Sequence, residues 1–135
     1  MTGVMAVIGT LGLATVFGLV WQRRTGRLKE QDVRGEWAFE LGALGERATL
    51  VQFSSAFCAP CRATKRVLAE VAELVEGVRH VEIDAESRLD LVRELNILKT
   101  PTVLVLDASG RIVQRAAGQP RKADVIAALG RLPGL

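Results

Sequence analysis

Residues 57–62 have the sequence FCAPCR, which contains both cysteines of this 135-residue chain, Cys58 and Cys61. The apolar run before this motif, residues 48–54, is typical of a buried strand. After it, apolar residues recur at helical spacing through residues 59–76, which predicts an amphipathic helix. Cys58 is therefore expected where a strand leads into a helix. Free backbone N–H groups and the helix dipole favour an anion at such a position.

The spacing of the two cysteines suits redox chemistry. A helix N-terminus would stabilise a thiolate at Cys58, which makes the sulfur nucleophilic near neutral pH. Pro60 falls in the first helical turn, where its missing N–H costs little. Cys61 lies one turn later on the same side, so it could attack a mixed disulfide formed by Cys58 and release the product. These residues together predict a reactive dithiol.

Other uses of the cysteine pair stay open from the residues alone. A structural zinc site needs four ligands, and only His80 remains as a further candidate. His80 stands at the start of a predicted strand, where we expect it at a solvent-exposed edge. Two soft thiolates could carry copper(I) or zinc for delivery, and a binding module could keep inert cysteines without turnover. No resident metal or cofactor is predicted, because a dithiol exchanges electrons with another dithiol.

Strand-like and helix-like segments alternate after the N-terminal region. Their order is strand, helix, strand, helix, strand, strand, helix, which predicts an α/β fold with a central mixed sheet flanked by helices. Ser87 and Asp90 form a capping pattern at the start of the short second helix. A weaker strand is expected at residues 37–41. The predicted strands are 48–54, 78–84, 102–106 and 111–117, and the predicted helices are 59–76, 87–95 and 121–132.

Residues 1–21 contain no charged side chain. At about 1.5 Å per residue, a helix of this length spans a bilayer core of roughly 30 Å, so the segment predicts one transmembrane helix. Trp21 would lie at the interface, where aromatic residues are enriched. A cleaved signal peptide is the main alternative, but such a peptide has a basic start and a small-residue cleavage site. Neither feature is present here.

Residues 22–35 are polar and basic, and predict a linker between the anchor and a domain at residues 36–135. The linker begins with Arg23, Arg24, Arg27 and Lys29. Because positive charge prefers the cytoplasmic side of a membrane, these residues predict a cytoplasmic domain, and a domain on the outer side stays open as the alternative. The net charge of the whole chain is only +3, so no nucleic-acid-binding face is expected.

From residue 50 to residue 129 the chain resembles the thioredoxin family. The segments that match are LVQFSSAFCAPCR, then HVEIDAES, then LKTPTVLVLDASGRIVQRAAG. The Cys-x-Pro-Cys before a helix is one family signature, and Thr-Pro-Thr at residues 100–102, leading into a strand, is the second. The resemblance implies a thioredoxin-like fold for the part of the chain that follows the anchor and linker.

The resemblance also implies thiol–disulfide exchange with protein partners. Cys58 would be the attacking thiolate and Cys61 the resolving thiol. In the family the second proline is cis and faces the cysteine pair, and the backbone before it pairs with an extended substrate. The implied substrate contacts are Phe57, Ala59, Pro60, Thr100 and Pro101. The implied partners are protein thiols and disulfides, with an upstream dithiol that gives or takes electrons. Oxidation, reduction and isomerisation all stay open as the direction of exchange.

Three positions depart from the family pattern. Phe57 stands where the family usually has Trp, and Ala59 stands where it usually has Gly. The largest departure is Gln52, because thioredoxins bury an Asp there that takes up a proton during turnover. A glutamine side chain can hydrogen-bond but does not titrate. This change argues against efficient general disulfide reduction.

Overall fold

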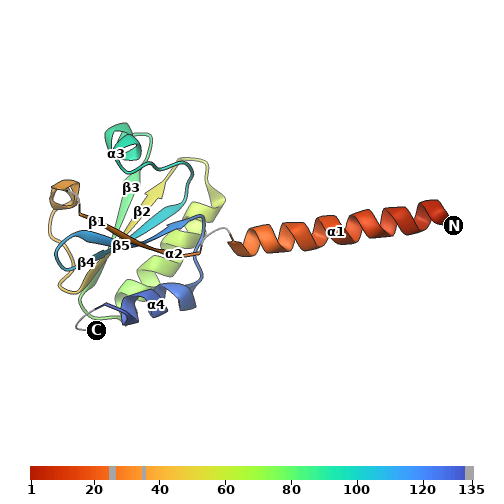
Figure 1. Ribbon diagram of the computed structural model, residues 1–135. Coiled ribbons are helices and arrows are strands. Elements are labelled where there is room, and N and C mark those ends of the chain that lie inside the picture. Colours follow the sequence, from red (N-terminus) through yellow and green to blue (C-terminus); the bar gives the residue numbers. More distant parts are fainter. Residues whose placement is uncertain (25–26, 35, 133–135) are drawn as a thin grey trace.

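The computed structural model describes residues 1–24, 27–34 and 36–132, and its body is a five-stranded sheet with helices on both faces (Figure 1). The strands stand in the order β1-β5-β4-β2-β3. They are β1 (Lys29–Arg34), β2 (Ala48–Ser54), β3 (Val78–Asp84), β4 (Thr102–Asp107) and β5 (Arg111–Ala117). The helical elements are α1 (Thr2–Arg24), the 3₁₀ helix η1 (Glu36–Leu41), α2 (Ala59–Leu74), α3 (Leu89–Glu94) and α4 (Lys122–Gly130).

Strand β2 lies inside the sheet and leads directly toward the cysteine motif. It pairs in parallel with β3, through the crossover helix α2, and antiparallel with β4. Every residue of β2 is buried. A strand covered on both faces needs a continuous apolar run, and the apolar run at residues 48–54 predicted this strand with the same bounds.

Residues of β2 alternate between two cores. Val51 and Phe53 pack with residues of η1 and α3 on one face of the sheet. Ala48 and Leu50 pack with α2 and α4 on the other face. Since side chains alternate along a strand, Gln52 points to the same face as Leu50, toward α2. The sheet thus places one buried amide directly beneath the helix that carries the cysteines.

The prediction of a linker at residues 22–35 is wrong for the second half of that segment. Residues 29–34 form β1, which pairs antiparallel with β5 and extends the sheet into the predicted linker. An edge strand is held by backbone hydrogen bonds to its neighbour and needs no apolar run. The polar sequence KEQDVR therefore gave no strand pattern.

Two smaller predictions are also wrong. Residues 37–41, expected as a weak strand, lie in the 3₁₀ helix η1, where the adjacent residues Trp37 and Ala38 are both buried. Adjacent buried side chains do not fit the alternation of a strand. The predicted cap Ser87 instead donates its hydroxyl to Asp84 Oδ2 (2.8 Å) in the preceding turn, and α3 starts at Leu89.

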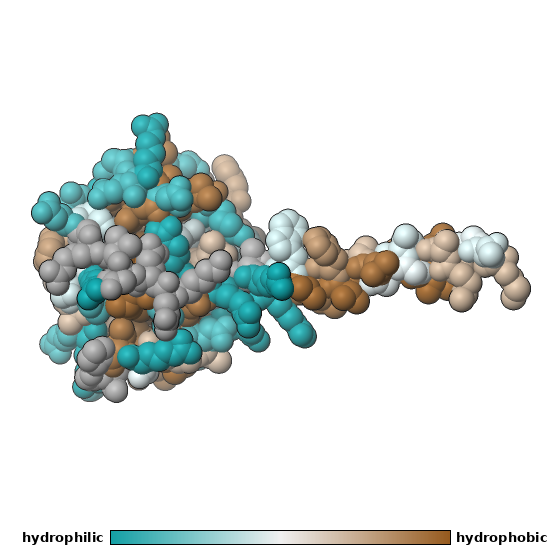
Figure 2. Space-filling model, in the orientation of Figure 1, coloured by the Kyte–Doolittle hydropathy of each residue, from teal (hydrophilic) through white to brown (hydrophobic). Residues whose placement is uncertain are grey.

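Helix α1 projects away from the sheet (Figure 1). All of its side chains are exposed. It is long and apolar enough to cross a membrane, as the sequence predicted. Apolar side chains follow its length, whereas hydrophilic residues gather on the body (Figure 2). The helix continues beyond Trp21 to Arg24, so its last turn carries Arg23 and Arg24.

Candidate active site

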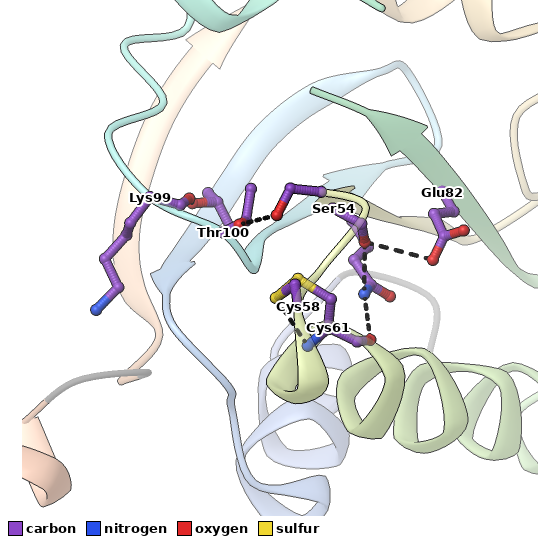
Figure 3. The surroundings of a disulfide bond; sticks show 9 residues. Ser54, Cys58, Cys61, Glu82, Lys99 and Thr100 are labelled. Carbon is purple, nitrogen blue, oxygen red and sulfur yellow. Dashed lines mark hydrogen bonds between the residues drawn. A yellow bond between two sulfur atoms is a disulfide. The ribbon is translucent and has the colours of Figure 1, made fainter. Parts of the chain in front are cut away.

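The two cysteines lie at the N-terminus of α2 and are joined by a disulfide (Figure 3). Cys58 is the N-cap residue, with an extended backbone, and its Sγ accepts the N–H of Cys61 at 3.2 Å. Pro60 falls in the first turn, as expected. The backbone N–H that meets the sulfur here would also donate to a thiolate after the disulfide opens.

The exposure of the two sulfur-bearing residues differs. Cys58 is 8% exposed and Cys61 only 3%. Phe57 is fully exposed beside Cys58, and Ala59 and Pro60 are exposed as well. A protein approaching this surface therefore meets Cys58 and its neighbours, whereas Cys61 lies deeper beneath them.

The second predicted segment lies next to the first. The Thr100–Pro101 peptide bond is cis, and Pro101 is buried. The hydroxyls of Ser55 and Thr100 are hydrogen-bonded at 2.9 Å, which ties the loop before α2 to the loop before β4 (Figure 3). The fold therefore brings the residues of the two signatures together at one end of the sheet.

A groove of about 730 Å³ begins at this junction, with Pro60, Thr100 and Pro101 in its wall. The other predicted contacts, Phe57 and Ala59, do not line it. Most of its charged lining is basic. The cationic lining residues are Arg23, Arg27, Lys99, Arg121 and Lys122, and the one acidic lining residue is Asp124.

Several of these cations have no acidic partner among the described residues. Arg121 pairs with Asp124 (3.3 Å), and Lys122 pairs with Glu70 (3.1 Å). Among the residues that the structure describes, Arg23, Arg27 and Lys99 have no carboxylate at ion-pair distance. The groove therefore presents excess positive charge beside the disulfide.

Gln52 joins the dithiol to the interior of the sheet. It is fully buried, and its Nε2 donates both to the backbone carbonyl of Cys61 (2.8 Å) and to Ser54 Oγ (2.9 Å). Ser54 Oγ in turn donates to Glu82 Oε2 at 3.3 Å (Figure 3). The amide at the position where thioredoxins bury an acid is thus an integral part of the site.

His80 belongs to the same cluster. It lies on β3, which is an edge strand as expected, but it is not solvent-exposed. It is half-buried, and its Nε2 lies 3.2 Å from Gln52 Oε1. Burial lowers the pKa of His80 below 6.5, and the nearby Glu82 carboxylate opposes that shift. Lys65 pairs with Glu82 at 3.4 Å and closes the cluster toward solvent.

Ser54, His80 and Glu82 were missed as site residues. The sequence did carry a signal for them, because polar residues alternate with apolar ones at positions 52 and 54 of one predicted strand and at positions 80 and 82 of the other. In the parallel pairing of β2 with β3, Gln52 lies opposite Glu82. In the described part of the chain, no three His, Cys, Asp or Glu side chains are grouped so that they could hold a metal ion.

Comparison with known proteins gives a consistent result. The family model described as Thioredoxin matches residues 33–131. The chain is 31% identical over 86 residues to "Thioredoxin" of Alicyclobacillus acidocaldarius, covering 62% of this chain and 81% of that protein. It is 26% identical over 77 residues to "Thioredoxin-2" of Pyricularia oryzae, covering 57% of this chain but only 45% of that longer protein.

The solved structure of a mutant thioredoxin from Halobacterium salinarum has a similar fold. Its TM-score is 0.62 at 16% identity, with 76% of this chain and 89% of that chain covered. The thioredoxin-like α/β fold predicted from the sequence is confirmed by this likeness.

Proposed function

Because this chain belongs to the thioredoxin family, we propose that it is a membrane-anchored thiol–disulfide oxidoreductase that acts on protein partners through Cys58 and Cys61. The observation that supports this most is the position of the disulfide. It lies at a helix N-terminus, in contact with a backbone N–H donor, and an exposed surface surrounds Cys58. Such a site favours a nucleophilic thiolate.

The proposed exchange runs in two steps. In the reductive direction, the Cys58 thiolate attacks a partner disulfide, forms a mixed disulfide and expels one partner thiolate. Cys61 then loses its proton and attacks the Cys58 sulfur, which forms the intramolecular disulfide and expels the second partner thiolate. The two electrons pass from the dithiol to the partner, and protons return to the partner thiolates. The oxidative direction is the reverse, and an upstream dithiol or disulfide resets the pair.

The anchor is the second part of the proposal. Large apolar side chains along α1 are exposed, among them Leu13 (74%) and Phe17 (71%), and such a surface is unfavourable in water. We place α1 across a membrane, with the body on the cytoplasmic side because Arg23 and Arg24 follow the apolar span.

A membrane-impermeant maleimide should therefore label the reduced cysteines in broken cells but not in intact cells. Labelling in intact cells would place the body outside.

The test of the function is the reduction potential of the pair, measured in the full chain in detergent micelles against glutathione and dithiothreitol buffers. A potential near or below about −250 mV indicates a reductase, and one above about −180 mV an oxidase or isomerase. The absence of a reversible two-electron couple would contradict the proposal and favour a binding module. One copper or zinc per chain after anaerobic purification would favour a metal carrier.

The basic groove should select partners by charge. We expect oxidised substrate peptides with acidic residues beside the cysteine to react roughly tenfold faster than basic ones at low salt, because opposite charge steers association. The preference should disappear at about 1 M salt, where screening acts over about 3 Å. The measurement is kcat/KM for matched acidic and basic peptides with the full chain.

Two charge reversals make this prediction specific. Lys99→Glu should weaken the preference for acidic peptides, because Lys99 lines the groove and has no described ion-pair partner. Arg93→Glu makes the same charge change at an exposed residue of α3 outside the groove, and should leave the preference intact. Equal rates for acidic and basic peptides with the unmodified chain would contradict the role of the groove.

A further inference from the structure

The exchange chemistry creates a negative charge at the N-terminus of α2. Apart from the cysteines themselves, no buried side chain in the described part of the chain can offset that charge by taking up a proton. The buried polar side chains in the described part of the chain belong to Thr, Gln and Ser residues, none of which titrates near neutral pH. Gln52, the buried side chain bonded to the Cys61 backbone, is an amide. The nearest titratable groups in its hydrogen-bond network are His80 and Glu82 on β3.

The hydrogen-bond network fixes how His80 meets Gln52. The carbonyl of Cys61 can only accept, so the group of Gln52 that faces it is the NH₂. The amide oxygen is therefore the atom that faces His80, and His80 Nε2 must carry the proton and donate to it. Nε2 stays bonded in both charge states of the imidazole, and Nδ1 is the atom that gains a proton. Protonation of His80 thus adds a positive charge without breaking its bond to Gln52.

Two further charges face the imidazole. Glu82, two residues along β3, favours the protonated ring, and Lys65 on α2 disfavours it. Burial also disfavours the charged ring and is the largest effect. With the disulfide closed, these influences together lower the pKa of His80, which favours the neutral imidazole. A new negative charge at the N-terminus of α2 would act in the opposite direction, because it favours the protonated ring.

We propose that His80 is a positioning residue whose protonation is coupled, through Gln52, to the redox state of the Cys58–Cys61 pair. The proposal rests on the proposed function and goes beyond it. When a partner dithiol reduces the disulfide, it supplies two electrons and two protons. One proton goes to Cys61, and while Cys58 remains a thiolate the second goes to Nδ1 of His80. The partner leaves as a disulfide, so atoms, electrons and charge balance. The imidazolium, linked to α2 through Gln52 and the Cys61 carbonyl, then stabilises the thiolate.

The direct test uses the fact that His80 is the only histidine of the chain. The full chain, ¹³C-labelled at histidine and carrying no histidine tag, is titrated by NMR in micelles, once oxidised and once reduced with dithiothreitol. We expect the proton affinity of His80 to be about fivefold higher in the reduced chain, a typical magnitude for coupling between two sites. Equal proton affinities in the two redox states would overturn the proposal. Absence of a reversible couple would instead overturn the proposed function.

Three variants separate coupling from a structural role. His80→Gln keeps an amide donor toward Gln52 but does not titrate, so the dithiol–disulfide equilibrium should lose the part of its pH dependence due to His80. Glu82→Gln should lower the proton affinity of His80 and move that pH dependence to lower pH, and Lys65→Gln should move it to higher pH. An unchanged pH profile in His80→Gln, or shifts in the same direction for both charge variants, would overturn the proposal.

Discussion

Replacing Cys61 by Ser is expected to trap partner proteins on Cys58 as stable mixed disulfides. Cys58 keeps its N-cap position and the backbone N–H of residue 61, so the first attack should still occur. The second attack needs a sulfur nucleophile at residue 61, and a serine hydroxyl is not ionised near neutral pH. Turnover of a disulfide substrate should fall by on the order of 10³-fold or more, as for other enzymes that lose a nucleophile. The trapped species should appear as higher-mass bands on a non-reducing gel and vanish with dithiothreitol.

Cys58→Ser is the matched control for this trap. It removes the more exposed sulfur and leaves Cys61, which is 3% exposed, as the remaining thiol. It should lose turnover to the same extent but trap no partners. If Cys58→Ser traps partners as well as Cys61→Ser does, the assignment of the attacking and resolving cysteines is reversed. If both variants keep full function in cells, the binding module is the better account.

The sequence predicted those helices and strands whose pattern of apolar and polar side chains reflects how they are buried. The strand β2 is buried on both faces and has the apolar run this requires. The Cys58 position followed from the junction between that strand and an amphipathic helix. Strand β1 went unpredicted because its place is set by backbone pairing with β5, which is largely independent of side-chain polarity.

The candidate active site likewise has parts that the local sequence predicted and parts that it did not. Cys58 and Cys61 lie close in sequence, so their spacing already indicated a pair. The environment of His80 depends on a different strand, since the parallel register of β2 and β3 brings it to Gln52. The basic groove likewise combines residues from α1, the loop before β4 and the start of α4. Contacts assembled from distant segments cannot be read from any one segment alone, because they depend on how the strands pair.

Phe53→Ala is expected to lower the free energy of unfolding by about 3–5 kcal/mol, the range measured for large aromatic residues truncated in protein cores. Phe53 is fully buried in β2, in the core formed with η1 and α3. Truncation leaves a cavity in the strand that carries Gln52 and leads into the cysteine motif. The measurement is urea unfolding of the oxidised full chain in micelles, followed by tryptophan fluorescence. A loss below about 1 kcal/mol would mean that the core does not pack as described.

Phe57→Ala is the matched control, because the same atoms are removed from a side chain that is fully exposed. Its effect on unfolding should stay within about 0.5 kcal/mol, as for most surface substitutions. An exposed aromatic ring beside Cys58 is nevertheless a large apolar contact for a protein partner, so the KM for protein substrates should rise several-fold while kcat changes little. A stability loss without a change in KM would assign Phe57 to packing. We expect a change in KM with the free energy of unfolding intact. That result would show that the partner-binding surface at Phe57 is distinct from the core at Phe53, four residues earlier in the chain.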